Sequence, residues 1–236
     1  MPHNKSLTSF LEEEDTLIIV PARLTLHGIF WFHTSAQSRG KYVHISAPVI
    51  HNYPLTLAFL GRPVEASYAN ISGLIEPSIT PEQVWRERGF YVYPAIAEKL
   101  LSRTLLFSMG GTGYAIMKLQ TRASVPDLAV NQVYLPGSKF KTFILLKSYS
   151  SLPKARVIRL GAKRYGVFQV KYERPRRVTV KAAGDKPVTH PFNEGDTALE
   201  GSRSILRHYM GNIAIFGYPD RVIVLDDVVL AAPKFI

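Results

Sequence analysis

Leu17-Ile18-Ile19-Val20-Pro21-Ala22-Arg23-Leu24-Thr25-Leu26-His27 is the first part of the chain with a clear structural pattern. Its first four residues are apolar and mostly β-branched, and its last five alternate between polar and apolar side chains. Both patterns are typical of β-strands, and the alternation is typical of a strand with one buried face. Gly28 then leads into a second apolar piece, Ile29-Phe30-Trp31-Phe32. The domain is therefore predicted to begin with strands.

Strands are also predicted to dominate the rest of the chain. Residues 104–107 and 114–119 are expected to form a hairpin, with Gly110-Gly111-Thr112-Gly113 as its flexible tip. Further strands are predicted over residues 91–94, 139–147, 156–160, 165–172, 178–181, 213–216 and 221–225. The last two are expected to pair around Gly217-Tyr218-Pro219-Asp220.

Short helices interrupt these strands. Thr80-Pro81-Glu82-Gln83 supplies an N-cap, a proline in the first turn and a capping-box glutamine, and Gly89 ends that helix. Asn52 is predicted to cap a helix over residues 53–60, with Gly61 as its stop, and residues 199–210 are interpreted as a third helix. This uneven mixture predicts an α+β fold with a largely antiparallel sheet.

The chain shows no internal repeat and no clear linker, so residues 16–236 are predicted to form a single domain. Residues 1–15 end in Glu12-Glu13-Glu14-Asp15 and are interpreted as an acidic, solvated tail. An acidic contact with a basic neighbouring subunit is the alternative for this segment.

The composition excludes several classes of protein. The chain is 46% hydrophobic, enough for a sizeable core, and it contains no cysteine, which excludes disulfides, thiolate metal sites and thiol catalysis. Residues 1–15 lack the apolar run of a signal peptide, and no segment reaches the roughly 18 apolar residues of a membrane helix. We therefore expect a cytoplasmic protein with no membrane partner and no cofactor.

The positive charge is concentrated in one segment, residues 147–181. This basic strip holds eleven Lys and Arg residues and a single acid, Glu173, whereas the rest of the chain holds 18 basic and 17 acidic residues. Such one-sided charge normally has an external counter-anion, and nucleic acid is the leading candidate because each neutralised phosphate releases a counterion. Within the strip, Arg159-Leu160-Gly161-Ala162-Lys163-Arg164-Tyr165 combines cations that can hold phosphate with a ring that can stack on a base.

Three other segments have both a structural and a functional interpretation. Gly110-Gly111-Thr112-Gly113 matches no phosphate-binding motif and is interpreted as a hairpin tip. Leu135-Pro136-Gly137-Ser138-Lys139 is either a Pro-Gly turn or a loop whose amides hold a phosphate, with Lys139 and Lys141 adding charge. His27, His33, His44 and His51 could support metal-independent RNA cleavage, although packing or capping explains each, and their spacing matches no metal site.

Four elements, in order, resemble one protein family. His51-Asn52-Tyr53-Pro54-Leu55-Thr56-Leu57-Ala58 is similar to the HNYxLTxA element of the small backbone subunit of type I-D CRISPR surveillance complexes, the Csc-one family within the Cas-five superfamily. The other three elements are Gly89-Phe90-Tyr91-Val92-Tyr93-Pro94-Ala95, Leu135-Pro136-Gly137-Ser138-Lys139-Phe140 and Arg156-Val157-Ile158-Arg159-Leu160-Gly161. The resemblance covers roughly residues 17–172. Pro54 and Ala162 depart from the family pattern.

The resemblance implies a ferredoxin-like, RRM-type fold with a protruding β-hairpin thumb, expected near residues 107–135. It implies a non-catalytic CRISPR RNA-binding subunit of a Cascade-type antiviral complex that caps the guide-RNA filament by holding the 5′ handle. The implied partners are the filament backbone subunit, the large subunit and target DNA near the target motif. Base pairing reads the target in such complexes, while the protein holds backbone and shape.

These arguments together assign candidate RNA contacts. Backbone clamping is predicted for Lys139, Lys141, Arg156, Arg159, Lys163 and Arg164, and base stacking for Tyr53 and Tyr165. His51 and Asn52 are either polar contacts to RNA or caps of the helix that follows. Two other functions remain open: a metal-independent CRISPR-type endoribonuclease that processes repeat RNA, and a generic RNA-binding protein.

Overall fold

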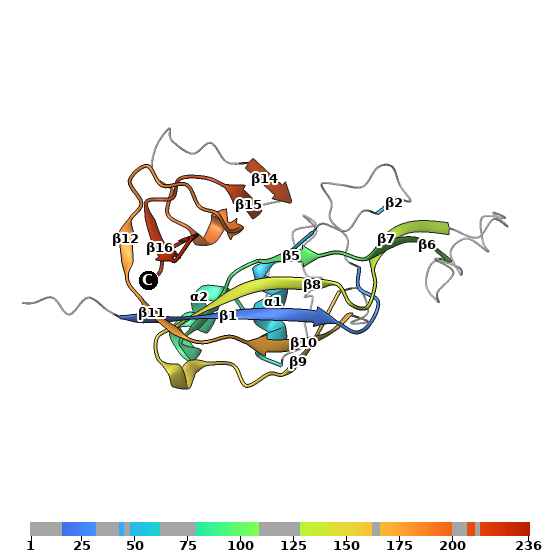
Figure 1. The fold of residues 1–236 in the computed structure, drawn as a ribbon, viewed down its shortest axis with the longest axis horizontal. Coiled ribbons are helices and arrows are strands. Elements are labelled where there is room, and N and C mark those ends of the chain that lie inside the picture. Colours follow the sequence, from blue (N-terminus) through green and yellow to red (C-terminus); the bar gives the residue numbers. More distant parts are fainter. Residues whose placement is uncertain are drawn as a thin grey trace, which may run out of the picture.

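The computed structural model describes residues 16–31, 43–44, 48–61, 79–108, 128–161, 166–199, 207–210 and 213–236. Its largest element is an eight-stranded sheet. The strands of this sheet are β1 (Leu17–Leu26), β3 (Val49–Ile50), β4 (Phe90–Val92), β5 (Ala95–Lys99), β8 (Lys139–Leu146), β9 (Val157–Leu160), β10 (Gly166–Tyr172) and β11 (Arg176–Val178). All of its pairings are antiparallel, in the order β3-β5-β8-β1-β10-β9, with β4 also on β8 and β11 also on β1 (Figure 1). The predicted α+β fold with an antiparallel sheet is confirmed.

Strand β1 lies at the centre of the sheet although it contains Pro21. One side of β1 pairs with β8 along most of its length, and the other side pairs with β11 over Leu17–Ile19 and with β10 from Ala22 onward. Pro21 lies at the break between these last two strands, where its carbonyl accepts a hydrogen bond from the amide of Glu173. Because the N and O atoms of a strand residue face the same side, the missing N–H of Pro21 points at this break, so the cost is confined to the one bond that it would donate to Glu173 at the end of the β10 ladder.

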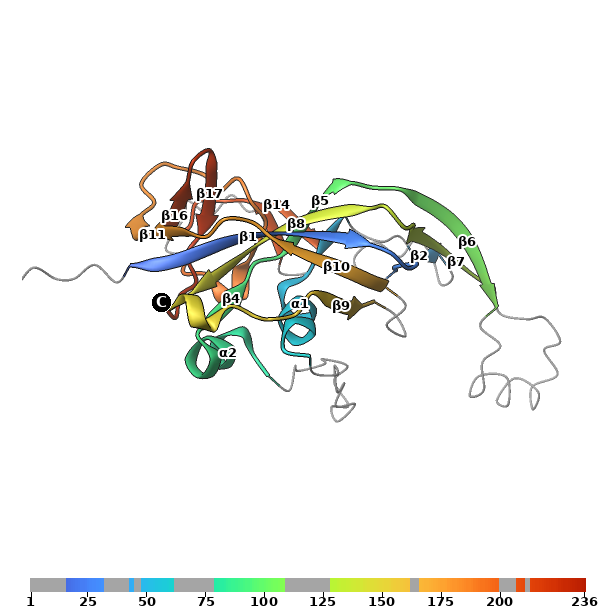
Figure 2. The ribbon, with the colours of Figure 1, turned by 60° about the horizontal axis from the view of Figure 1, so that its bottom comes forward.

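Helices α1 (Asn52–Phe59) and α2 (Pro81–Arg88) cover one face of the sheet, as Figure 2 shows. Val20, Ala22, Leu24 and Leu26 alternate toward this face and pack with Leu55 and Phe59 of α1 and Val84 of α2. The predicted start and end of α2 are confirmed: Thr80 and Gln83 form a capping box, and Gly89 adopts a left-handed conformation at the C-cap. The N-cap of α1 is His51, not Asn52 as predicted, because His51 Nδ1 accepts the Tyr53 amide proton.

The last third of the chain forms a layer on the other face of the sheet (Figure 2). This C-terminal layer contains two sheets. One is formed by β12 (Val180–Ala182), β16 (Arg221–Leu225) and β17 (Val228–Ala231), and the other by β13 (Phe192–Asn193), β15 (Ile213–Phe216) and β14 (Arg207–Met210). The 3₁₀ turn η4 (Glu194–Asp196) directly follows β13. Ile223, Leu225 and Leu230 of this layer share a core with Leu17 and Ile19 of β1 and with Phe143 and Leu145 of β8. Residues beyond Tyr172 are therefore integral to the fold.

Two predictions about this last third are wrong. Arg207–Met210 is strand β14 and not the end of a helix. Strands β15 and β16 exist as predicted but do not pair with each other, because β15 lies between β13 and β14 while β16 lies between β12 and β17. The turn of the last hairpin is at Asp226, which has a positive φ of 51°.

A third group of strands extends beyond the end of the main sheet (Figure 1). It consists of β6 (Ser102–Ser108), β7 (Leu128–Tyr134) and the short β2 (Val43–His44). Strands β6 and β7 are antiparallel, with Ser102 opposite Tyr134 and Ser108 opposite Leu128. The partner of residues 104–107 is therefore β7 and not residues 114–119, which, like Gly110 to Gly113, lie outside the described residues. In the part of the chain that the structure describes, no helix is long and apolar enough to cross a membrane.

Candidate nucleic-acid interface

The face of the sheet opposite the helices is only partly covered by the C-terminal layer. Strand alternation places Arg23 and Thr25 of β1 on this face, because Ala22, Leu24 and Leu26 point to the helix-side core. Residues directly opposite in the ladder share a face, so the strand register identifies their neighbours. We call the part of this face around Arg23 and Thr25 the open face.

Three cations form a row across the middle of the open face. Lys141 of β8 and Lys171 of β10 both lie directly opposite Arg23 of β1. Adjacent strands are about 4.8 Å apart, and like charges directly opposite one another destabilise a sheet. Such a row is unfavourable for the isolated protein, but it fits an anionic ligand that lies across the strands.

Arg23 is partly neutralised by two acids. Its Nε lies 2.9 Å from a carboxylate oxygen of Glu173 and 3.7 Å from one of Glu98, and about half of its side chain is exposed. Exposed ion pairs of this kind add little stability, but they hold the guanidinium in place between the two lysines.

Further cations surround the row. Lys139 lies opposite Thr25, Lys99 opposite Lys139, and Arg159 of β9 opposite Val167 of β10. We name the open-face cluster by its six members: Arg23, Lys99, Lys139, Lys141, Arg159 and Lys171. Among the described residues around these members, the acids paired with the cluster are Glu98 and Glu173, so its net charge is strongly positive.

Lys141 lies at the border between the open face and the C-terminal layer. Its Nζ is 5.2 Å from the centre of the Phe143 ring, and Phe143 packs edge-on against the buried His190. The pKa of His190 is lowered to about 4: burial is the main cause, a 2.8 Å hydrogen bond to the carbonyl of Pro94 opposes it, and the charge of Lys141 adds to it. His190 is therefore neutral at pH 7, and Nε2 donates this bond.

The structure brings three of the predicted RNA contacts together. Lys139, Lys141 and Arg159 belong to the open-face cluster, although they come from different strands. Arg156 is exposed but lies elsewhere: its guanidinium is 5.3 Å from the centre of the Tyr172 ring, which packs against the helix-side core. Burial raises the pKa of Tyr172 to about 12, and its hydroxyl donates to the carbonyl of Ala155. Lys163, Arg164 and Tyr165 lie outside the described residues.

Asn52 and Tyr53 contribute to a buried hydrogen-bond network rather than to an exposed surface. Asn52 is fully buried. Its amide nitrogen donates to Asp196 Oδ2 over 2.6 Å, the Tyr53 hydroxyl donates to Asp196 Oδ1 over 3.2 Å, and the Tyr91 hydroxyl donates to Oδ2 over 3.2 Å. The prediction that Asn52 contacts RNA is corrected, because its side chain has no accessible surface.

This network, which we call the Asp196 clasp, joins α1 to the C-terminal layer. Asn193 Nδ2 completes it by donating to Asn52 Oδ1 over 3.0 Å. Burial raises the pKa of Asp196 above its ordinary value, and the hydrogen bonds from Asn52, Tyr53 and Tyr91 oppose that shift. Burial and the charge of Asp196 raise the pKa of Tyr53 to about 12. Tyr53 is half-buried in the clasp, so its hydroxyl is engaged with Asp196 rather than presented to a ligand.

Residues 135–139 form a turn and not a phosphate loop. The Gly137 amide donates to the carbonyl of Leu26, and the Ser138 amide donates to that of Leu135. Ser138 is buried, and its hydroxyl oxygen lies 3.1 Å from the carbonyl of Leu101 and 2.9 Å from that of Leu135, so its one proton is shared between them. The same oxygen accepts the Leu101 amide proton. The amides that would cradle a phosphate are therefore used within the protein, and the loop anchors the base of β6 and β7.

The basic strip does not form one surface. Arg159 and Lys171 lie on the open face, Lys147 is 5.3 Å from the centre of the Trp85 ring, and Arg176 is paired with Asp226 of the C-terminal layer. Conversely, four of the six members of the open-face cluster lie outside the strip: Arg23, Lys99, Lys139 and Lys141. Alternation within β1 could have placed Arg23 on a polar face, but only the strand register reveals Lys141 and Lys171 beside it.

The histidines do not form a catalytic group in the described residues. His51 Nδ1 caps α1, and Nε2 of the exposed His27 lies 3.3 Å from Gln169 Oε1. His33 and the side chain of His44 lie outside the described residues. Among the residues that are described, no cluster of His, Asp and Glu could hold a metal ion.

Comparison with solved structures finds CRISPR proteins. The chain is 14% identical, with a TM-score of 0.43, to a chain in the cryo-EM structure of the Type III-B Cmr-beta bound to cognate target RNA; the match covers 70% of this chain and 61% of that one. It is 13% identical, with a TM-score of 0.39, to a CRISPR protein from Archaeoglobus fulgidus, over 92% of this chain and 99% of that one. No curated protein matches this chain.

A family comparison is more specific. Residues 17–209 match the model of the family described as type I-D CRISPR-associated protein Cas5/Csc1. The match includes the helix that begins with His51-Asn52-Tyr53, the strands that carry the open-face cluster, and Asp196 of the clasp. The chain therefore belongs to the type I-D Cas5/Csc1 family of CRISPR-associated proteins.

Proposed function

We propose that this subunit binds the guide RNA of a type I-D effector complex, with the open-face cluster holding the RNA backbone. The observation that carries the proposal is the row Lys141–Arg23–Lys171, in which two lysines face one arginine across three neighbouring strands. An RNA backbone that crosses the strands would neutralise this repulsion and release counterions.

The finer roles come from the resemblance to the family. The RNA segment is the 5′ handle, the neighbours are the filament backbone subunit and the large subunit, and target DNA passes near the large subunit. On this proposal, the sheet with α1 and α2 is a ferredoxin-like core, and β6 and β7 are the base of the thumb. The cytoplasmic location stays a prediction.

The test is a charge reversal in the row with a matched control. The Lys141→Glu/Lys171→Glu variant changes the charge of the open face, whereas Lys181→Glu/Lys186→Glu makes the same change on exposed lysines of the C-terminal layer. Binding of a fluorescent handle-containing RNA is measured from about 50 to 200 mM salt. Each lost phosphate contact reduces the slope of log K against log salt by about 0.7 for single-stranded RNA.

We expect the row variant to bind more weakly by at least about tenfold and to lose about 1.4 from the slope, as two phosphate contacts predict. The control variant should keep the slope of the unmodified protein. Equal losses of affinity in both variants would show that binding depends on overall charge, and would reject the open face as the RNA-binding surface. Equal binding of handle-containing and scrambled RNA would reject handle recognition and favour a generic RNA-binding protein.

We propose further that the subunit does not cut RNA. The proposal is supported by His51, whose Nδ1 is used as a helix cap, and by His27, whose ring contacts Gln169. Incubation with repeat RNA in EDTA should leave the RNA intact. A discrete product that is lost in a His27→Ala/His51→Ala variant would instead identify a metal-independent ribonuclease.

A further inference from the structure

Tyr149 has the most exposed large apolar side chain among the described residues, at 60%. It lies in the 3₁₀ turn η2 (Tyr149–Ser151), which follows β8. The core clusters formed by the described residues do not include Tyr149. Tyr149 therefore presents a free aromatic surface.

The turn that carries Tyr149 is held in place. The Ser151 amide donates to the carbonyl of Ser148, and the Leu152 amide donates to that of Tyr149. The Ser148 hydroxyl lies 2.8 Å from that of Ser150 and 3.2 Å from that of Ser151.

Close packing against α2 adds to this rigidity. A Cβ at Gly89, the C-cap of α2, would lie 2.6 Å from Ser151 Oγ, so the turn sits directly on the end of the helix. Leu152, which follows the turn, packs against the helix-side core. The backbone beneath Tyr149 is thus fixed before any ligand arrives, which lowers the entropy lost on binding.

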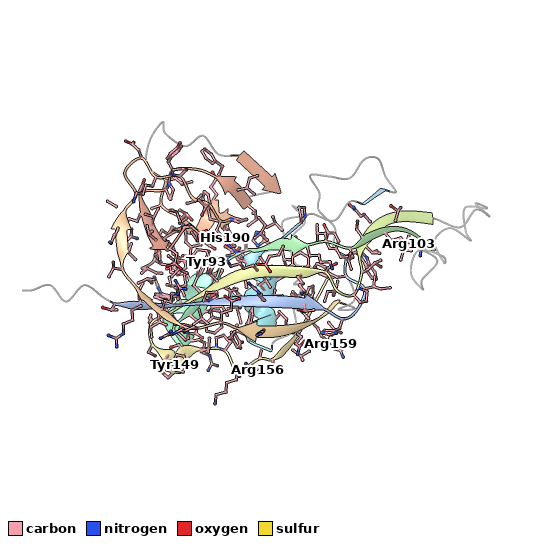
Figure 3. All side chains as sticks on the ribbon, viewed as in Figure 1. Tyr93, Arg103, Tyr149, Arg156, Arg159 and His190 are labelled. Carbon is pink, nitrogen blue, oxygen red and sulfur yellow. The ribbon has the colours of Figure 1, made fainter. Side chains whose placement is uncertain are left out.

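The surroundings of Tyr149 in the chain are cationic. The segment from Lys147 to Tyr172 contains no acidic residue, and Lys147, Lys154 and Arg156 are exposed on either side of the turn. In Figure 3, Tyr149, Arg156 and Arg159 follow one another along the lower edge of the view, from the η2 turn to β9. Because Arg159 belongs to the open-face cluster, this line of residues continues from the cluster to the exposed ring.

We propose that Tyr149 is a base-stacking residue for a nucleotide of the same RNA, at the point where the strand leaves the open face along the β9 edge. An exposed ring between cations is the arrangement that binds single-stranded nucleic acid, since the ring stacks on a base while the cations hold phosphates. The cations and the absence of acids favour RNA over an apolar protein segment as the occupant. The inference rests on the proposed function and adds a residue and a path to it.

The test uses the full-length protein and RNAs that each carry 2-aminopurine at one position. Stacking on Tyr149 should quench the fluorescence at one or two positions. Tyr149→Ala should restore that fluorescence and weaken binding on the order of tenfold, because a stacked base contributes about 1–3 kcal/mol. Tyr149→Phe keeps the ring and should behave like the unmodified protein. Val224→Ala removes another exposed apolar side chain, from β16, and is the matched control.

The outcomes separate this inference from the function on which it rests. If Tyr149→Ala binds and quenches normally while Lys141→Glu/Lys171→Glu loses binding, the stacking role is wrong and the open face stands. If neither variant changes binding, both proposals are wrong. If Tyr149→Phe loses as much affinity as Tyr149→Ala, the hydroxyl rather than the ring makes the contact, and stacking is rejected.

Discussion

At the scale of single residues, His51-Asn52-Tyr53, part of the element that resembles the family, has a structural role that its residue types do not indicate. His51 caps α1, and Asn52 and Tyr53 hold the carboxylate of Asp196, which is 4% exposed. A buried carboxylate held by several hydrogen-bond donors is costly to disturb, because removal of one member leaves the others unsatisfied.

Asp196→Ala should therefore lower the free energy of unfolding strongly. The change leaves the buried donors of Asn52 and Tyr91 and the half-buried hydroxyl of Tyr53 without their acceptor, and each unsatisfied buried donor costs about 1–3 kcal/mol. We expect a loss of at least about 3 kcal/mol in urea denaturation. Asp227→Ala removes an exposed carboxylate from the same layer, at a position without positive φ, and should cost less than about 1 kcal/mol. Similar losses in the two variants would show that the clasp is not a stabilising network.

The role of this string could not be predicted from the sequence, for a physical reason. Asn52 and Asp196 are 144 residues apart in the chain, so the acceptor cannot be inferred from the local pattern. Both the RNA contact and the helix cap were reasonable interpretations of polar residues at a helix start. The cap is confirmed for His51 because it depends only on neighbouring residues.

At the scale of elements, the same distinction explains which predictions succeeded. Helix α2 and the central strands were predicted from local signals: a capping box, a left-handed glycine and apolar alternation. Pairing partners were predicted poorly: residues 104–107 pair with β7 and not with residues 114–119, and β15 does not pair with β16. The cationic row on the open face follows from such pairing, which is why half of the open-face cluster was missed.

Shortening the hairpin of β6 and β7 should leave the rest of the protein folded. Its base is anchored by the Phe30–Tyr134 bridge and by the Leu135 amide, which donates to the carbonyl of Leu101. Of its described side chains, only Tyr134 belongs to a core cluster. Leu105 lies opposite Asn131, so an Asn-Gly turn can join them directly in place of residues 106–130.

We expect this shortened variant to melt within a few degrees of the unmodified protein and to keep RNA affinity, because the open face is unchanged. Assembly with the filament partner, measured by size-exclusion chromatography, should be lost if the hairpin is the thumb. A large drop in Tm would show that the hairpin is needed for folding, and normal assembly would reject the thumb assignment.

At the scale of the whole molecule, the C-terminal layer and the main sheet depend on each other. The described residues of the layer cover one end of the sheet and leave the open face at the other end uncovered (Figure 2). The same arrangement therefore provides stability and the surface that is proposed to bind RNA. The family match ends at residue 209, but the strands that complete this shared core, β16 and β17, lie beyond it.

A chain that stops after Met210 should therefore fail to fold, although it contains all of the family match. The deletion removes Ile223, Leu225 and Leu230 and exposes Leu17, Ile19 and Leu145 against which they pack. Full burial of an apolar side chain contributes about 1.5–3 kcal/mol, so the three losses together approach the 5–15 kcal/mol stability of a typical domain. We expect an aggregated product with no cooperative thermal transition, while Val224→Ala, an exposed position in the full chain, should melt normally. A soluble truncated chain with an unchanged Tm would show that the main sheet folds alone and that the shared core is dispensable.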